Sequence, residues 1–212
     1  MVIVPSMWVI QRTAEDDGKQ AGNLKAHLVV RGDQDYAEGD IPCDSPTVDR
    51  STVKLMLAIA ANENWSLRSI DISAAFLQGC QIDRIVHVQP PPEFRKPGVV
   101  WRLNKGLYGL KEAARLWYDK LLERLQKNGG QKLTEDSACI VFHNEQKKLI
   151  GFVIIHVDDI IISGTQKFVD WIVAIIKRRF KVSKDQLDKF TYTGMSIRKD
   201  ILGAIFLNQN LL

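Results

Sequence analysis

The sequence predicts an α+β protein in which helices cover one face of an antiparallel sheet. Two apolar, β-branched runs, residues 149–155 and 160–164, flank the tetrapeptide 156–159 and predict a buried hairpin. Apolar residues at helical spacing predict three helices, at residues 51–64, 112–128 and 166–179. The 212 residues can form one sizeable domain or two small lobes.

The N-terminal part of the chain predicts a hairpin followed by a loop. Residues 7–12 and 24–32 read as its strands, and the polar segment 13–23 joins them. Residues 33–50 contain many Asp, Gly and Pro residues and show little periodicity, so we expect no regular element there.

A helix and a strand follow this loop. The helix at 51–64 begins at a cap formed by Asp49 or Ser51 and has a broad apolar face, which consists of Val53, Leu55, Met56, Ile59 and Ala60. The next run, residues 65–72, predicts a short strand that brings Asp71 close to its end.

Proline and glycine mark the ends of the later elements. Pro90, Pro91 and Pro92 stop a strand at 85–88, and Gly129 and Gly130 stop the helix at 112–128. The elements that complete the predicted sheet are the hairpin around 156–159, the helix at 166–179, and closing strands at 190–197 and 204–207.

Composition excludes several classes of protein. The net charge of +4 permits a nucleic-acid partner without identifying one. Cys43, Cys80 and Cys139 are scattered, which argues against a disulfide framework or a zinc site. The most apolar stretch, residues 152–162, contains two aspartates and is too short to span a membrane. With no signal-peptide pattern, we expect an intracellular, reducing compartment.

Three carboxylates at strand ends point to divalent-metal chemistry. Asp158 and Asp159 are adjacent, so they repel each other and are costly to desolvate between two buried strands. Together with Asp71 they offer the oxygen ligands that Mg²⁺ prefers, and two Mg²⁺ ions can drive phosphoryl transfer. The alternative is structural, with the Asp-Asp pair forming a turn and Asp71 capping the residues after it.

Several segments carry a resemblance to a known family, and they occur along the chain in the family's order. The chain resembles the reverse transcriptases of copia-type LTR retrotransposons. His156–Asp159 resembles the family's Tyr-Val-Asp-Asp, and residues 103–118 resemble its Lys-x-Leu-Tyr-Gly-Leu-Lys-Gln-Ala-Pro-Arg-x-Trp-Tyr signature. The other similar segments are residues 7–10, 25–32, 71–79 and 87–91.

The resemblance implies a right-hand polymerase fold and its activity. Fingers are expected at roughly 1–50 and 80–108, and a palm at roughly 51–79 and 109–207. The implied reaction is RNA-directed DNA polymerisation, in which two Mg²⁺ ions, or Mn²⁺, assist transfer from a dNTP to a primer 3′-hydroxyl. The implied partners are an RNA or DNA template with primer, deoxynucleoside triphosphates and the remainder of a Pol polyprotein. The implied location is a cytoplasmic virus-like particle or the nucleus.

The same resemblance assigns roles to single residues. Asp71, Asp158 and Asp159 would be the catalytic metal ligands, with Asp159 the weaker because neighbours on extended backbone point to opposite sides. The nucleotide-binding residues would be Phe76 under the sugar, the Ile72 carbonyl, Lys25 and Arg31 at the triphosphate, and Tyr108 and Gly109. The residues expected at nucleic acid are Lys111, Arg115 and His156. The alternatives are a core position for Phe76 and solvated surface positions for the cations.

The chain departs from the family pattern at four positions. His156 replaces a Tyr, Ala114 a Pro, Glu112 a Gln, and His27 a basic residue. The chain also stops near where the family leaves the palm, so we expect a fragment or degenerate copy without thumb, connection and RNase H. The alternative function is a non-catalytic relic or domesticated palm that binds nucleic acid or a protein partner.

Overall fold

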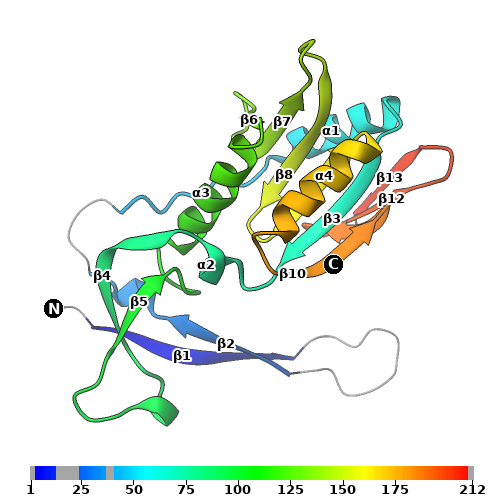
Figure 1. Cartoon of the computed structure of the whole chain (residues 1–212). Helices are drawn as coiled ribbons and strands as arrows, with labels where there is room; N and C mark the ends of the chain where they lie inside the picture. The colour runs from blue at the N-terminus through cyan, green and yellow to red at the C-terminus, as the bar shows by residue number, and fades with distance from the viewer. Residues whose placement is uncertain (1–2, 13–23, 37–40, 210–212) are drawn as a thin grey trace. The chain divides into compact units, whose positions relative to one another are not determined.

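The structure, a computed structural model, mixes strands with helices and confirms the predicted α+β class (Figure 1). The parts of the chain that it describes are residues 3–12, 24–36 and 41–209. The loop expected at 13–23 lies outside these residues.

The chain divides into two compact units. Unit 1 consists of residues 1–44 and 76–119, and unit 2 consists of residues 45–75 and 120–212. The naming of parts of the chain as fingers and palm stays a prediction.

Unit 1 contains a four-stranded sheet. Its strands, in the spatial order β2-β1-β4-β5, are β2 (Leu24–Val30), β1 (Ile3–Arg12), β4 (Gln81–Gln89) and β5 (Trp101–Lys105). β1 pairs antiparallel with β2, which confirms the predicted hairpin, and parallel with β4. The strand predicted at 85–88 lies within β4, whereas β5 was not predicted. The short helices of this region are η1 (Gly32–Gln34), α2 (Ala75–Gln78) and η2 (Pro92–Phe94).

Backbone segments approach each other closely at Gly32 and Gly109 in unit 1. A Cβ added to Gly32 would lie 2.0 Å from the Gly109 carbonyl oxygen, and one added to Gly109 would lie 2.0 Å from that of Val30. The Val30 N–H donates to the Tyr108 carbonyl over 2.8 Å. The hydrophobic core of this unit consists of Val4, Val30, Val86, Val88, Leu107, Leu110 and Ala113.

Unit 2 is built on a six-stranded sheet whose neighbouring strands all pair antiparallel. Its strands, in spatial order, are β10 (Val182–Leu187), β3 (Ser66–Ile72), β9 (Asp159–Gly164), β8 (Leu149–His156), β7 (Cys139–His143) and β6 (Gln131–Lys132). The β8–β9 hairpin confirms the prediction for the apolar runs at 149–155 and 160–164. β6, β7 and β10 were not predicted.

A smaller three-stranded sheet completes unit 2. It consists of β11 (Lys189–Tyr192), β12 (Met195–Lys199) and β13 (Ile205–Gln209). The strand predicted at 190–197 is therefore two strands. A tight turn separates them at Thr193 and Gly194, where φ is 47° and 79°.

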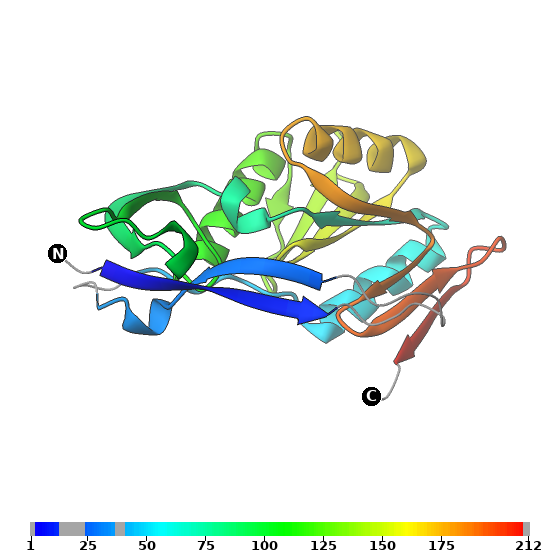
Figure 2. The same cartoon turned by 90° about the horizontal axis from the view of Figure 1, so that it is seen from below.

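Helices lie on both faces of the six-stranded sheet, and not on one face as the sequence predicted (Figures 1 and 2). α4 (Gln166–Lys177) and α3 (Ala113–Gln126) lie on one face, and α1 (Arg50–Asn62) packs against the other with β11 and β12. The placement of α1 follows from strand alternation, because Leu67 and Ile161 turn toward α1 while Ile160 and Ile162 turn away.

The ends and faces of these helices mostly follow the sequence pattern. Asp49 caps α1 by accepting a hydrogen bond from the Ser51 N–H over 2.7 Å. The expectation for Leu55 was wrong, because this side chain is 59% exposed. It lies two residues beyond Val53, which is about 200° around the helix and therefore on the opposite side.

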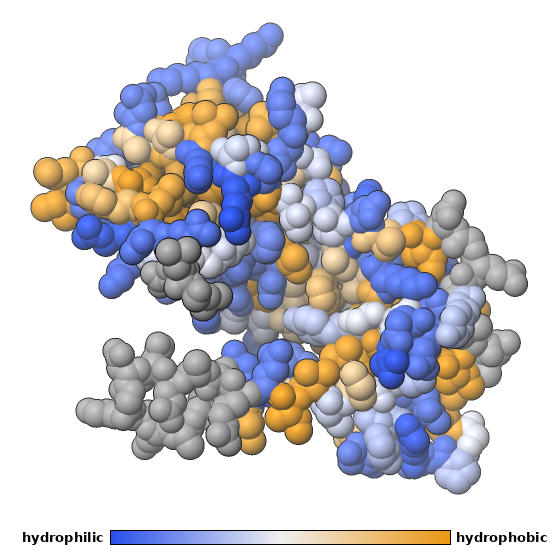
Figure 3. Space-filling model, turned by 180° about the vertical axis from the view of Figure 1, so that it is seen from behind, coloured by the Kyte–Doolittle hydropathy of each residue, from blue (hydrophilic) through white to orange (hydrophobic). Residues whose placement is uncertain are grey.

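Hydrophobic side chains also gather on the surface of unit 2, where Figure 3 shows them over the end that carries α1 and the small sheet. The exposed apolar residues of that region are Leu55, Ile201, Leu202, Phe206 and Leu207. No helix among the described residues is both long and apolar enough to cross a membrane.

Candidate active site

A tight, strained turn joins β8 to β9. His156 and Asp159 are paired across the hairpin, so Val157 and Asp158 form a two-residue turn. Val157 has a φ of 55°, a left-handed conformation that is costly for a β-branched residue. A positive φ at the first turn residue is the pattern of a type II′ turn, which normally has Gly there. Such strain concentrates at functional sites.

Sheet register places four ionisable residues in one row. Lys184 of β10 is opposite Asp71 of β3, Asp71 is opposite Asp159 of β9, and Asp159 is opposite His156 of β8. Residues directly opposite each other share a face of the sheet, with Cβ atoms about 4.5–5.5 Å apart. The two central aspartates are therefore neighbours, with a cationic or titratable residue beside each.

The third aspartate joins this row through the backbone. The Ile72 N–H donates to the Asp158 carbonyl over 3.0 Å, so the turn is tied to the residue that follows Asp71. The side chain of Ile72 is buried. Asp71, Ile72, His156, Asp158 and Asp159, which the sequence predicted as site residues, thus occur together in unit 2.

The row is electrostatically strained at Asp159. Burial raises the pKa of this carboxyl above its usual value, and the charges of Asp158 and Asp71 raise it further. His156 and Lys184 act in the opposite direction and favour the charged form. Carboxylates arranged in this way gain from a bound cation, which would relieve their mutual repulsion.

Two residues beside Asp71 were missed by the sequence analysis. Ser183 donates from its hydroxyl to the Asp71 carboxylate and to the Asp71 carbonyl, and Lys184 is the cross-strand neighbour of Asp71. Both belong to β10, whose polar sequence gives no strand signal. Only the pairing of β10 with β3 brings them to the site.

A buried tyrosine lies behind the other end of the row. The rings of His156 and Tyr192 are 6.2 Å apart in an edge-to-face arrangement. The Tyr192 hydroxyl and His156 Nδ1 are buried and have no hydrogen-bond partner among the described residues. Burial raises the pKa of Tyr192 well above its ordinary value, and the charge of Asp159 adds to the shift.

The predicted nucleotide contacts Phe76, Tyr108 and Gly109 cluster separately, within unit 1. Phe76 in α2 is half-buried, with its ring 4.6 Å from that of Tyr108, and His27 packs edge-on to Tyr108 at 5.5 Å. Gly109 has a φ of 85° and lies against the Val30 carbonyl. A side chain at position 109 would collide with the Val30 carbonyl of β2, so packing alone explains the glycine.

The predicted cationic contacts also belong to unit 1, and three of the four have partners within it. Arg31 makes a two-point ion pair with Asp33, which raises the pKa of Arg31. The Lys111 ammonium donates to the Asp35 carbonyl over 2.9 Å. Lys25 is exposed on β2 and has no ion-pair partner among the described residues.

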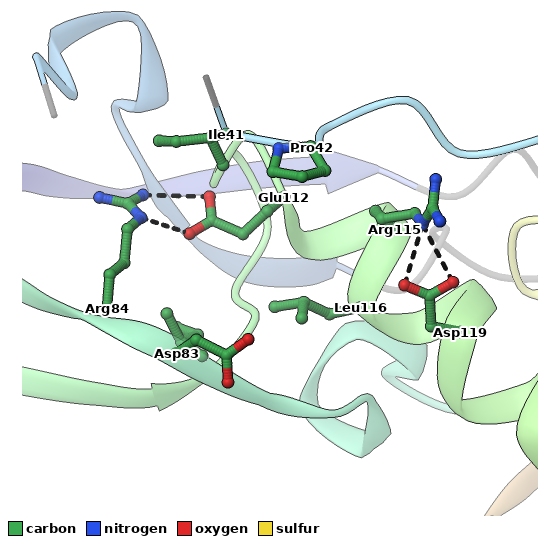
Figure 4. A pocket seen from close by; sticks show the side chains of 9 residues that line it. Ile41, Pro42, Asp83, Arg84, Glu112, Arg115, Leu116 and Asp119 are labelled. Carbon is green, nitrogen blue, oxygen red and sulfur yellow. Dashed lines mark hydrogen bonds and ion pairs between the residues drawn. The ribbon is translucent and has the colours of Figure 1, made fainter. Parts of the chain in front are cut away.

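Arg115 lines a cavity of about 340 Å³ in unit 1, and Figure 4 shows it bound to Asp119. In the same cavity Arg84 makes a two-point ion pair with Glu112 at 2.6 and 3.0 Å. Arg84 also pairs with Asp35, whose side chain is 2% exposed. Glu112 therefore belongs to a charged network that connects β4 with the start of α3. The cavity is lined by Ile41, Pro42, Ile82, Asp83, Arg84, Glu112, Arg115, Leu116 and Asp119.

The donor set of the row suits a divalent cation in its chemistry. Asp71, Asp158 and Asp159 offer carboxylate oxygens, the ligands that Mg²⁺ prefers. Within the described residues, however, no three His, Cys, Asp or Glu side chains form a ready-made metal cluster. The Ser183 hydroxyl donates a hydrogen bond to an Asp71 carboxylate oxygen, so this oxygen already has a partner within the protein.

Comparison with known proteins adds an independent finding. The family described as "Reverse transcriptase (RNA-dependent DNA polymerase)" matches residues 2–211. The chain is 33% identical over 171 residues to the retrovirus-related Pol polyprotein from transposon RE1 of Arabidopsis thaliana, covering 77% of this chain and 11% of that protein. It is 30% identical over 207 residues to the corresponding RE2 polyprotein of the same plant, covering 94% and 14%.

Among solved structures, the chain is similar to a foamy viral protease-reverse transcriptase in complex with double-stranded DNA. The TM-score is 0.48 and the identity 15%, over 97% of this chain and 32% of that chain.

Proposed function

The chain belongs to the reverse transcriptase (RNA-dependent DNA polymerase) family, and we propose that it catalyses template-directed addition of deoxynucleotides to a primer 3′-hydroxyl. The observation that carries this proposal is the row Lys184–Asp71–Asp159–His156 with Asp158 in the adjoining turn. It gathers three carboxylates, the Lys184 ammonium and the His156 imidazole at one end of the six-stranded sheet. This is an arrangement that phosphoryl transfer can use.

Asp71, Asp158 and Asp159 would hold two Mg²⁺ ions, or Mn²⁺ in their place. When bound, such ions lower the pKa of an attacking hydroxyl and stabilise the departing pyrophosphate. The protein residues hold the geometry. The Asp158 carbonyl is fixed by the Ile72 N–H, and Ser183 orients the Asp71 carboxylate.

Substrate contacts are assigned to unit 1 in this proposal. Phe76 and Tyr108 offer a pair of tilted aromatic rings for contact with the nucleotide, and the Phe76 ring would exclude a 2′-hydroxyl. Lys25 and Arg31 would contact the triphosphate, with Arg31 exchanging its exposed Asp33 partner for phosphate oxygens. Lys111 and Arg115 would contact the nucleic-acid backbone only by giving up their present partners. His156 would lie at the primer terminus.

The template, the primer and the rest of the polyprotein are proposed partners. The chain spans 11–14% of the RE1 and RE2 Pol polyproteins, so we place it as one enzymatic part of a longer Pol chain. Cys43, Cys80 and Cys139 form no disulfide in the described part of the chain, which suits work inside the cell, in a virus-like particle or the nucleus.

Primer extension tests the proposal. The wild-type chain should extend oligo(dT) on poly(rA) with Mg²⁺ or Mn²⁺, and Asp158→Asn should reduce extension by at least about 100-fold, as expected for loss of a catalytic group. The matched control is Asp44→Asn, which removes an exposed carboxylate in unit 1 and should extend normally.

Primer extension, combined with a binding assay, also distinguishes the polymerase from the alternative, non-catalytic function. A chain that binds primer–template in a mobility-shift assay but extends with neither metal would be the non-catalytic nucleic-acid binder. Extension by Asp158→Asn at the wild-type rate would remove the carboxylates from the mechanism.

A further inference from the structure

A basic pocket lies in unit 2 between the second half of α3 and the end of α4. Its volume is about 100 Å³, room for several water molecules or one hydrated oxyanion. It is lined by Lys120, Glu123, Arg124, Lys127, Arg179 and Phe180. Nothing in the proposed polymerase chemistry uses these residues.

The charges in the pocket do not balance. Glu123 is the one acidic residue in the lining, and both lysines are paired with it, Lys120 over 2.8 Å and Lys127 on the next turn. The two ammonium groups lower the pKa of Glu123 to about 2, so this carboxylate is charged throughout the neutral range. Arg124 and Arg179 make no ion pair among the described residues, which leaves two guanidinium groups without an anion.

Arg124 carries a buried donor that lacks an acceptor. Its Nε is shielded from solvent and has no hydrogen-bond partner in the described part of the chain. A buried N–H without a partner is costly, and more so when the group is charged. A bound ion or water is one of the explanations for such a group in a native protein. The donor is therefore the second observation, besides the charge excess, that points to an anionic ligand.

The pocket is fixed by the segment that follows α4. Phe180 is buried and closes one wall, and its N–H donates to the Ile176 carbonyl over 2.8 Å. The next residue, Lys181, accepts at its carbonyl the Ser73 N–H over 2.9 Å. This wall of the pocket is thus tied to the loop that leaves β3 just after Asp71.

We propose that this pocket is a phosphate site, separate from the carboxylate row. The planar guanidinium groups of Arg124 and Arg179 match the oxygens of a phosphate group, and the surplus of positive charge favours a phosphate over a single carboxylate. The phosphate group is either part of a nucleic-acid strand that passes over the α3–α4 face or a free inorganic phosphate.

Titration of the full chain with inorganic phosphate tests the site. In isothermal titration calorimetry, Arg124→Gln/Arg179→Gln should bind phosphate at least about tenfold more weakly than wild type. The control Lys132→Gln/Lys148→Gln removes the same charge from exposed positions of unit 2 and should stay within about twofold. An equal loss in both double variants would reduce the effect to net charge and overturn the proposal.

A gain-of-function variant keeps the proposal testable if the arginine variant does not fold. Glu123→Gln removes the competing carboxylate and releases Lys120 and Lys127. Its affinity for phosphate should rise several-fold. An unchanged or weaker affinity would contradict an oxyanion site at this place.

A fluorescent single-stranded oligonucleotide distinguishes the two sources of phosphate. If a strand occupies the pocket, Arg124→Gln/Arg179→Gln should bind it more weakly and lower the salt slope by about 0.7 per lost contact. If the oligonucleotide binds equally to both proteins while inorganic phosphate binding falls, the occupant is the free anion. Asp158→Asn should bind inorganic phosphate as wild type does, which separates this site from the polymerase proposal. Wild-type phosphate affinity in the arginine double variant would refute both versions.

Discussion

Single residues show where the isolated chain carries unfavourable energy, and Asp159 is the clearest case. Burial and two neighbouring carboxylates raise its pKa, so the charged form that prevails at neutral pH is disfavoured in the folded state. The cost is present above the folded pKa and is relieved as the pH falls through it. Asp159→Asn should therefore raise the free energy of unfolding at pH 7 by about 1 kcal/mol or less.

Urea denaturation checks this expectation without any activity assay. The difference between the variant and wild type should shrink below about pH 4, where an ordinary aspartate is also protonated. A variant that is less stable than wild type at pH 7 would show that the Asp159 carboxylate makes a favourable contact instead.

A substitution of Phe76 tests whether this residue stabilises the hydrophobic core or contacts the substrate. Its ring is half-buried against Tyr108, so Phe76→Ala should cost about 1.5–3 kcal/mol, less than the 3–5 kcal/mol of a fully buried phenylalanine. Phe94→Ala, at a 54% exposed ring, is the control and should cost less. Ribonucleotide incorporation should rise in Phe76→Ala relative to deoxynucleotide incorporation. A full core-sized loss, with no change in sugar selectivity, would place Phe76 in the core.

Elements with a strong local pattern could be predicted, and those that depend on distant pairing could not. The β8–β9 hairpin is apolar along its length, and α4 has its apolar residues on one side, so both were evident from the sequence. β10 is a polar edge strand with only weak alternation, and nothing local distinguishes it from a loop.

The same contrast divides the candidate site. The three aspartates follow recognisable motifs, and so they could be named in advance. Ser183 and Lys184 reach Asp71 only because β10 joins the sheet beside β3. Long-range register of this kind is not encoded in the residues on either side of the motif.

One carboxylate adds side-chain contacts to the backbone pairing that attaches β10 to β3, which leads to a prediction for the element. Asp185 accepts two hydrogen bonds from Arg68 of β3, at 2.6 and 2.8 Å, and pairs with Lys177 of α4. These partners lower the pKa of Asp185 to about 2. Asp185→Asn should reduce the free energy of unfolding by about 1–2 kcal/mol after allowance for solvent screening.

The pH dependence of this contribution has a definite sign. A lowered folded pKa means that the stabilisation is present above about pH 4, the unfolded value, and is lost as the pH falls toward about 2. Asp170→Asn is the matched control, since Asp170 is 3.8 Å from the same Arg68 but 57% exposed, and it should cost less than about 0.5 kcal/mol. Equal losses in the two variants, measured by urea denaturation, would contradict a special role for Asp185.

At the scale of the whole molecule, the proposed catalytic and binding roles are divided between the two units. The carboxylate row and the basic pocket belong to unit 2, and the aromatic pair and the Arg84 network belong to unit 1. Helix α3 runs from one unit into the other, because the division falls between Asp119 and Lys120 within its length.

Metal binding should be visible as stability of the entire chain, independently of polymerase activity. A ligand that binds only the folded state at ten times its dissociation constant adds about 1.4 kcal/mol, or about 3–6 °C in Tm for a chain of this size. We expect Mg²⁺ or Mn²⁺ to produce such a shift, because a bound cation relieves the repulsion among Asp71, Asp158 and Asp159. Asp158→Asn should lose most of the shift, and Asp44→Asn should keep it. A thermal-shift experiment in which Asp158→Asn responds like wild type, or in which wild type responds to neither ion, would remove the metal from the carboxylate row.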